Sequence, residues 1–191
     1  MGQYTTRPIT INECNDIFNV LLNGATFEHN GSKLRIQPNY KVYLALYTMA
    51  NVGLRISDIL QLTPNRIKSG QLAIVEKKTN KQQLRPIPPT VYNKLIDYIL
   101  EHNISSDSLI FDTTERNIQK VLKKVCLYLG LENVSTHSFR KLFATTMYQA
   151  SGSDYNLVKE LLNHSSIATT QRYIGKDYSK INKYSSISIV D

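Results

Sequence analysis

One segment limits the fold of this chain strongly, because it repeats apolar side chains at helical spacing and carries cationic side chains beside them. Residues 138 to 150 are expected to form a helix that stops before Gly152. Its apolar stripe consists of Phe139, Leu142, Phe143, Thr146, Met147 and Ala150. A stripe at this spacing is typical of the buried face of an amphipathic helix.

Two side chains at the start of this segment are candidates for chemistry. Arg140 lies roughly 90° from the centre of the stripe, which suits an arginine whose stem is buried while its guanidinium faces a cleft. His137 precedes it by three residues, so both side chains can project from the first turn toward one point. Lys141 falls on the opposite side and is expected to be solvated. Alone, Arg140 would be interpreted as a structural arginine that caps a carboxylate.

Further side chains along the chain are suited to gripping and attacking a phosphate without a metal. Arg55 stands upstream in Gly53-Leu54-Arg55-Ile56-Ser57-Asp58. His164 follows Leu161-Leu162-Asn163, and Tyr173 ends Thr170-Gln171-Arg172-Tyr173. In this order and at these spacings, Arg55, His137, Arg140, His164 and Tyr173 resemble the catalytic domain of the tyrosine recombinases, the phage-integrase family of DNA strand-exchange enzymes.

The resemblance covers residues 8 to 178 and carries expectations about fold and activity. It implies a mainly helical α+β fold with a small antiparallel β-sheet. It also implies a site-specific recombinase that cleaves and rejoins DNA, for the integration, excision or inversion of a DNA segment, with no cofactor and no metal. A non-catalytic DNA-binding protein that retains the fold stays open as an alternative, as does DNA relaxation of the type IB topoisomerase kind.

The resemblance also implies a role for each residue. Tyr173 attacks the phosphorus and forms a 3′-phosphotyrosyl link, while Arg55 and Arg140 hold the non-bridging oxygens. Arginine suits this task because its planar fork binds two phosphate oxygens at once and keeps its charge. The covalent link stores the energy of the broken bond, so a 5′ hydroxyl can reseal the strand without ATP.

The histidines and a lysine complete the implied site. His137 resembles the family's first histidine, which exchanges a proton with the tyrosine hydroxyl, and His164 resembles the second, which binds the phosphate. Lys78 is the candidate general acid that protonates the leaving 5′ oxygen. Lys77 and Lys81 stay open as alternatives, because all three stand in one basic segment.

Two other residues near the motifs need an interpretation. Tyr178 is the competitor of Tyr173, but it stands 14 residues beyond His164, outside the expected interval. Asp58 follows Arg55 by three residues and is expected to orient Arg55 rather than to take part in chemistry.

Capping and turn signals divide the first part of the chain. Thr10 and Glu13 occupy the positions of a capping box, which predicts a first helix over residues 10 to 23. Residues 23 to 37 are expected to form a loop, and residues 39 to 50 a second helix that ends at Gly53. Ser57 is expected to cap a short helix over residues 58 to 62, which places Arg55 in the bend between two helices.

The rest of the chain predicts one hairpin and further helices. Two β-like runs, residues 71 to 76 and 83 to 88, predict a hairpin with a basic tip. Helices are expected over residues 90 to 101, 114 to 129 and 154 to 162. The chain is expected to be a single catalytic domain over residues 1 to 191, without the family's N-terminal core-binding domain. Its tail, residues 179 to 191, is expected to dock on a neighbouring protomer.

Composition favours a nucleic-acid partner and disfavours other classes. Lys plus Arg number 23 against 15 Asp plus Glu, with a pI near 9.4, which together with the resemblance indicates double-stranded DNA. Cys14 and Cys126 lack ligand spacing, so neither a disulfide nor a zinc site is expected. The acidic residues are scattered, which disfavours a metal-dependent nuclease.

The same sequence gives expectations about location and assembly. Its apolar runs are shorter than the roughly 18 residues that a spanning helix needs, and its first residues lack a secretion signal. A cytoplasmic, DNA-associated protein without a membrane partner is therefore expected. The resemblance implies a homo-oligomer, a tetramer acting on two duplexes, and leaves room for an accessory protein that bends the DNA.

Overall fold

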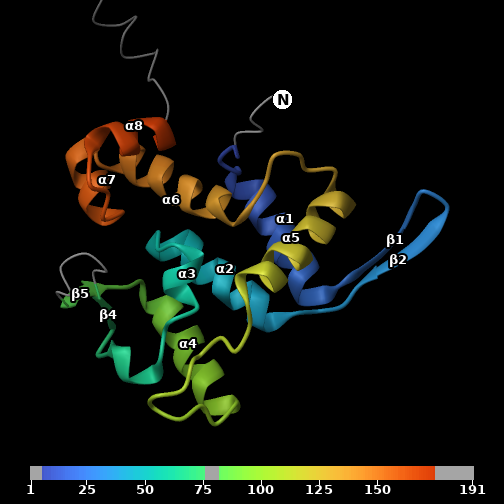
Figure 1. Cartoon of the computed structure of the whole chain (residues 1–191), viewed down its shortest axis with the longest axis horizontal. Coiled ribbons are helices and arrows are strands. Elements are labelled where there is room, and N and C mark those ends of the chain that lie inside the picture. The colour runs from blue at the N-terminus through green and yellow to red at the C-terminus, as the bar shows by residue number, and fades with distance from the viewer. Residues whose placement is uncertain (1–5, 76–81, 175–191) are drawn as a thin grey trace, which may run out of the picture. The chain divides into compact units, whose positions relative to one another are not determined.

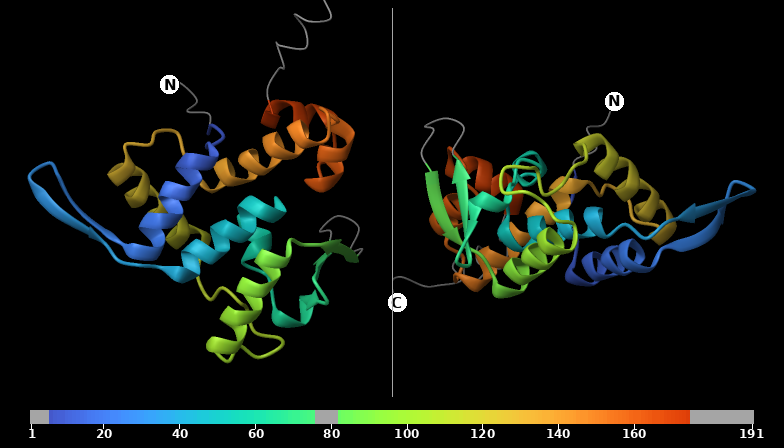
Figure 2. Two further views of the ribbon diagram at one scale, coloured as in Figure 1. Left: turned by 180° about the vertical axis from the view of Figure 1, so that it is seen from behind. Right: turned by 90° about the horizontal axis from the view of Figure 1, so that it is seen from below.

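The computed structural model describes residues 6–75 and 82–174, and the chain divides into two compact units, Met1–Phe143 and Ala144–Asp191. Helices make up most of the described residues, with two small antiparallel sheets (Figures 1 and 2). The expected fold class, mainly helical α+β, is confirmed. No helix among the described residues is both long and apolar enough to cross a membrane.

The first unit begins with helix α1 (Ile11–Asn23), whose start is fixed by the predicted capping box. The Thr10 hydroxyl accepts the Glu13 N–H at 3.1 Å, and the Glu13 carboxylate accepts the Thr10 N–H at 2.8 Å. The apolar face of α1 packs against α2 (Tyr40–Val52) and α5 (Glu115–Leu129). The predicted first and second helices are confirmed.

Residues 23 to 37 are not the expected loop, because they form two antiparallel strands, β1 (Ala25–His29) and β2 (Ser32–Ile36). The turn between them consists of Asn30 and Gly31, with φ of 49° and 72°. Two consecutive positive φ angles define the type I′ turn that matches strand twist, and Asn-Gly is its usual sequence. The pair is therefore the local signal that predicts a hairpin here.

The hairpin projects away from the helices of its unit (Figures 1 and 2), while side chains on one of its faces contact α5. Phe27 and Leu34 are cross-strand partners on that face, and the Phe27 ring lies 5.3 Å from the ring of Tyr128 on α5. Lys124 of α5 donates a hydrogen bond to the Arg35 carbonyl at 2.6 Å. These contacts hold the base of the hairpin against α5.

Helix α2 ends at Gly53, as predicted, and the next helix begins earlier than predicted. Helix α3 comprises Ile56–Ile59, and its N-cap is Arg55 rather than Ser57. Arg55 has an extended backbone, and its carbonyl accepts the N–H groups of Asp58 and Ile59 at 2.9 and 3.0 Å. These bonds close the first turn of α3, so the Arg55 side chain leaves from the helix start.

A three-stranded antiparallel sheet follows a short 3-10 helix (Pro64–Arg66). Its strands are β3 (Ile67–Lys68), β4 (Gln71–Val75) and β5 (Gln82–Pro86), in the order β3-β4-β5. The predicted hairpin is confirmed as β4 and β5, with Val75 opposite Gln82, and β3 is an additional strand. Helix α4 (Pro89–Glu101) then leads through a loop to α5.

Helix α6 (Thr136–Ala150) begins in the first unit and continues into the second. It starts two residues before the predicted Ser138. The second unit continues with α7 (Tyr155–Leu161), whose first N–H groups are capped by Asp154 at 2.8 and 3.1 Å, and with α8 (Ile167–Ile174). The helix predicted over residues 154 to 162 is confirmed as α7, whereas α8 is not among the predicted helices.

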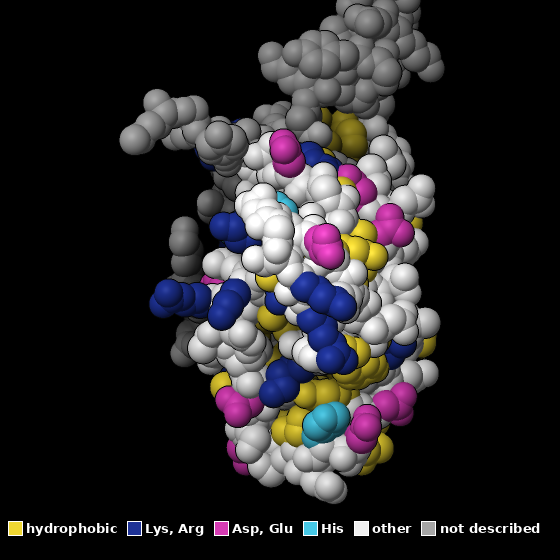
Figure 3. Space-filling view, turned by 90° about the vertical axis from the view of Figure 1, so that its right-hand side faces the viewer, with side chains coloured by type: hydrophobic (Ala, Val, Ile, Leu, Met, Phe, Trp, Pro, Cys, Tyr) yellow, Lys and Arg dark blue, Asp and Glu magenta, His cyan; other side chains and the backbone are white. Residues whose placement is uncertain are grey.

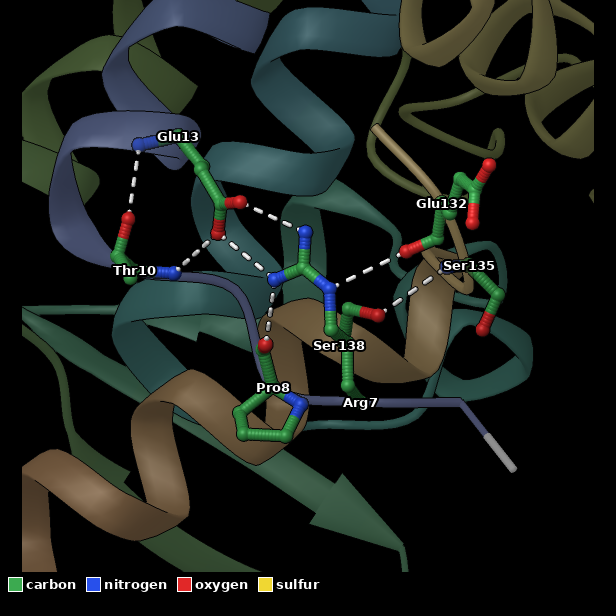
Figure 4. Close-up of polar contacts among 7 residues, drawn as sticks. All are labelled: Arg7, Pro8, Thr10, Glu13, Glu132, Ser135 and Ser138. Atoms are coloured by element: carbon green, nitrogen blue, oxygen red, sulfur yellow. Dashed lines mark hydrogen bonds and ion pairs between the residues drawn. The ribbon is translucent and has the colours of Figure 1, made fainter. Parts of the chain in front are cut away.

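The N-terminal segment is tied to α1 and to the loop before α6 through Arg7 (Figure 4). The Arg7 guanidinium donates to both Glu13 carboxylate oxygens, at 2.6 and 2.9 Å, and to the Glu132 carbonyl at 3.1 Å. At the adjacent α6 start, the Ser135 N–H donates to the Ser138 hydroxyl at 3.1 Å. Lys141, which was expected to be solvated, instead donates to the Thr6 carbonyl. The first turn of α6 is thereby anchored.

The Arg7–Glu13 pair gives stability a pH dependence. Hydrogen bonding from Arg7 lowers the pKa of Glu13 to about 2, from an ordinary value of 4.5. A carboxyl with a depressed folded-state pKa stabilises the fold above its unfolded pKa and loses that contribution as pH falls through the folded pKa. We expect Glu13→Gln to flatten the fall in unfolding free energy between pH 4.5 and pH 2. Chemical denaturation across this range tests it, with Glu28→Gln on exposed β1 as the control. An unchanged slope in Glu13→Gln contradicts the prediction.

Candidate active site

The first turn of α6 brings together His137 and Arg140, as their spacing predicts. Arg140 is 1% exposed, so its guanidinium is not open to a cleft in the way the sequence suggested. Its Nη1 donates a 2.6 Å hydrogen bond to the carbonyl of Gly53, which ends α2. A hydrogen bond from a charged donor in a buried place is stronger than a neutral one. This bond fixes the guanidinium beside the bend that carries Arg55.

Two properties of glycine matter at Gly53. Its place at a helix end indicates the first, a left-handed backbone, but not the second, a close contact with α6. Its φ of 72° lies in the left-handed region, which favours glycine. A Cβ at this position would also lie 2.3 Å from Cδ1 of Phe143. The absence of a side chain lets α6 approach the bend closely enough for Arg140 to reach the carbonyl.

Arg55 stands two residues beyond Gly53 and is exposed. Its side chain is therefore available to an external anion. The expected contact with Asp58 is not formed: in the part of the chain described, Asp58 accepts a 3.4 Å hydrogen bond from Ser57 and makes no ion pair with Arg55. Among the described residues, no carboxylate forms an ion pair with Arg55.

The surroundings of His137 lower the pKa of its imidazole. Loss of hydration around the ring is the largest cause, and the positive charges of Arg140 and Arg55 add to it, while Glu115 opposes them. The two guanidinium groups are therefore close enough to His137 to act on its charge. A lowered pKa keeps the imidazole neutral near pH 7 and able to accept a proton.

In the second unit, His164 and Tyr173 come together. His164 is 6% exposed, and its Nδ1 lies 2.9 Å from the hydroxyl of Thr170, which is fully buried. The rings of His164 and Tyr173 are 5.0 Å apart and inclined at 66°. Helix α8 carries both Thr170 and Tyr173, so one short helix positions the tyrosine and orients the histidine. Thr170 was missed in the sequence, where only its place six residues after His164 marks it.

Tyr155, which precedes His164 in the sequence, has a structural contact. Tyr155 packs its ring 4.4 Å from that of Tyr148 within the second unit. Tyr178, the competitor of Tyr173, lies outside the described residues, as do the tail residues 179 to 191. Lys78 and its alternatives Lys77 and Lys81 also lie outside them, although β4 and β5, which lead to that segment, are described.

The His, Cys, Asp and Glu side chains of the described parts of the chain are scattered, and the two thiols are buried. No group of three or more His, Cys, Asp or Glu side chains there could hold a metal ion. Cys14 and Cys126 are free and buried, and burial raises their pKa values to about 12 and about 11. Thiols with such pKa values stay protonated and are poor nucleophiles.

Comparison with known proteins assigns this arrangement to a family. The family model described as the phage integrase family matches residues 29–180. The chain belongs to the phage integrase family. Within the family match lie Arg55, His137, Arg140, His164 and Tyr173, in the order the resemblance required.

Curated relatives of this phage integrase family chain include a probable integrase/recombinase of Acholeplasma phage L2, 26% identical over 83% of the chain and 59% of the relative. Tyrosine recombinase XerC of Agrobacterium fabrum is 34% identical over 68% of the chain and 44% of the relative. The chain thus spans about half the length of these two relatives. The probable integrase/recombinase YoeC of Bacillus subtilis is 29% identical over 74% of the chain and 81% of the relative.

Solved structures of other integrase-family proteins share the fold. A XerH site-specific recombinase bound to difH substrate matches with a TM-score of 0.69 at 21% identity, over 97% of this chain and 55% of that one. The catalytic domain of bacteriophage HP1 integrase matches with a TM-score of 0.61 at 17% identity, over 96% of this chain and 97% of that one. The fold of a tyrosine recombinase catalytic domain is therefore shown.

Gly53→Ala should destabilise this integrase-family fold more than the same change at another helix end. Gly130, which ends α5 with φ of 66°, has nothing within 4 Å of an added Cβ. Both changes incur the cost of a left-handed alanine, roughly 1 kcal/mol, but only Gly53→Ala collides with Phe143. Denaturant unfolding of the two variants measures the difference. Equal losses would mean that the Phe143 contact imposes no constraint.

The pKa of His137 should respond to the charges around it in opposite directions. Arg55→Gln removes a positive charge and should raise the pKa, whereas Glu115→Gln removes a negative charge and should lower it. NMR titration of the imidazole in the two variants and the native chain measures both shifts. Shifts of one sign in both variants would contradict the arrangement.

Proposed function

We propose that this chain cleaves and rejoins double-stranded DNA through a 3′-phosphotyrosyl intermediate, as a site-specific recombinase. The observation that carries the proposal is the pairing of Tyr173 with buried His164 in a member of the phage integrase family. Names of relatives support it, since they include tyrosine recombinases and a recombinase bound to its DNA substrate. We propose that the two units act together as one catalytic domain.

In the proposed cleavage step, the Tyr173 hydroxyl oxygen bonds to phosphorus and the bond from phosphorus to the 5′ oxygen breaks. The phenol proton must leave, and the leaving 5′ oxygen must gain a proton. The lowered pKa of His137 supports its role as acceptor of the phenol proton. Lys78 is proposed as the donor to the 5′ oxygen. Attack by a 5′ hydroxyl on the phosphotyrosyl group reverses the step and reseals a strand.

Charge developing on the non-bridging oxygens needs fixed donors. Arg140 and Arg55 are proposed to supply them in different ways. Arg140 is held by the Gly53 carbonyl through Nη1 and is buried in the free protein, so its proposed role requires that DNA binding uncover the guanidinium. Arg55 is exposed and can close on the phosphate. His164 is proposed to donate to the same phosphate, with Thr170 fixing its ring through Nδ1. Preorganised donors of this kind contribute much of the stabilisation of a charged transition state.

Partners and location follow from the same proposal. Double-stranded DNA is the proposed substrate. A homo-oligomer, a tetramer on paired sites, is proposed as the acting form, with residues 179 to 191 docking on a neighbour and an accessory DNA-bending protein as a further partner. A cytoplasmic, DNA-associated location is proposed, and the outcome is integration, excision or inversion of a DNA segment.

Tyr173→Phe should abolish covalent attachment to DNA, because only the nucleophilic oxygen is lost. The probe is supercoiled plasmid incubated with the protein, with and without EDTA, and assayed for protein-linked 3′ ends. Tyr155→Phe, on α7 of the same unit, is the matched control and should form the link normally. Linkage should persist in EDTA. A link formed by the Tyr173→Phe variant, or cleavage that needs a metal and leaves no protein on the DNA, would exclude the proposal.

Arg55→Lys should retain charge but lose the bidentate fork, so cleavage of the plasmid should slow by about a hundredfold. Filter binding of the same plasmid should change only slightly, because phosphate attraction depends mainly on charge. Arg35→Lys, on exposed β2, is the control and should cleave at the native rate. A native cleavage rate in Arg55→Lys would reduce Arg55 to part of a basic surface.

A further inference from the structure

The first unit has an apolar groove of about 820 Å³ between β2 and α5 that the proposed chemistry does not use. Its floor is made of side chains that share apolar character: Leu34, Leu122, Cys126, Leu127, Leu131 and Val134. Lys120, Lys123 and Lys124 line its rim. We call these residues the lysine groove. It combines an apolar floor with a positively charged edge.

The chemistry of the lysine groove favours a protein segment over a nucleic acid. Phosphates need cations but gain nothing from aliphatic side chains, whereas an amphipathic segment uses both. Leu127 and the neighbouring Tyr128 are 44% and 41% exposed, so apolar area is left open there. Figure 3 looks onto the side where the hairpin lies and shows Lys and Arg side chains gathered across the middle of that face, with hydrophobic side chains exposed beside them.

A segment with the complementary pattern lies on α4 of the same unit. Leu100 is 68% exposed at the end of α4, whereas Tyr92 and Ile96 on the preceding turns are partly buried against the core of the unit. Asp97 and Glu101 form an exposed acidic line beside Leu100, four residues apart. We call Asp97, Leu100 and Glu101 the acidic ridge. Its negative charges match the lysines of the lysine groove, and its exposed leucine matches the apolar floor.

We propose that the lysine groove receives the acidic ridge of a second copy of this chain. The lengths are compatible: Asp97 to Glu101 span about 6 Å of helix, which fits within the span of about 11 Å from Lys120 to Leu127. Leu100 would enter the apolar floor, while Asp97 and Glu101 would meet Lys120 and Lys123. Each copy carries both groove and ridge on different elements, so the contact is head-to-tail, and such contacts close into rings or continue as chains.

This interface goes beyond the proposed DNA cleavage and involves none of its residues. Because the groove and the ridge are different surfaces, the contact fixes the orientation of each copy relative to the next. Both surfaces belong to the first unit. Charge complementarity supplies its specificity, and the buried leucine its apolar contribution. Its strength should therefore fall with added salt.

Charge reversal on each side tests the contact in a way that a DNA-binding role would not imitate. One variant carries Lys120→Glu and Lys123→Glu, and the other Asp97→Lys and Glu101→Lys. Sedimentation velocity at low salt measures self-association of the native chain and of each variant. We expect each variant alone to associate at least about tenfold more weakly than the native chain, because like charges then face each other. An equimolar mixture should associate again, since each copy finds an opposite charge on its partner.

Controls and opposing outcomes separate this proposal from the alternatives. Lys68→Glu and Asp16→Lys, on exposed parts of β3 and α1, should leave association unchanged. Leu100→Ala should weaken it without a change of charge. A native chain that stays monomeric at every concentration, or variants that fail to complement each other when mixed, would overturn the proposal. If only the lysine variant loses plasmid binding and neither changes association, the groove serves DNA instead.

Discussion

The hydrogen bond from Arg140 to the carbonyl of Gly53 joins residues 87 positions apart and places Arg140 beside the bend that carries Arg55. Burying a guanidinium is costly unless its donors are satisfied, so the fold must supply acceptors where α6 meets the end of α2. The left-handed turn at Gly53 presents that carbonyl, and the missing side chain gives Phe143 its place. Arg55 then follows at the start of α3, exposed and near His137.

The rest of the first unit keeps this junction in place. Arg7 ties the N-terminal segment to α1 and to the loop before α6. Lys141 on α6 donates a hydrogen bond to the Thr6 carbonyl of the same segment. In the second unit, α8 restricts two side chains in a similar way. It packs Tyr173 against His164 and gives the histidine a hydroxyl partner. Both sets of contacts restrict side chains of the candidate site, which under the proposed function lowers the entropy lost when a substrate binds.

The sequence predicts what local signals encode. The capping box at Thr10 and Glu13 and the glycine after α2 yield the first two helices, and the ordered motif residues identify the family. The Asn-Gly pair could have predicted the hairpin of β1 and β2, but the glycine, asparagine and serine residues of this stretch favoured a loop. The buried state of Arg140 was not predictable, because its acceptor is a backbone carbonyl far along the chain. Asp58 illustrates the opposite error, in which sequence proximity suggested a contact that the fold does not make.

The most direct test of this account is the hydrogen exchange of arginine side chains. NMR of the free protein with 15N-labelled arginine resolves the guanidinium protons, and Arg55→Lys assigns the Arg55 signals by their loss. A guanidinium donor buried in a hydrogen bond exchanges with water slowly, and an exposed one exchanges fast. We predict slow exchange for the Arg140 Nη1 protons and fast exchange for those of Arg55. Arg140 protons that exchange as fast as those of Arg55 would show that the bond to Gly53 does not organise the site.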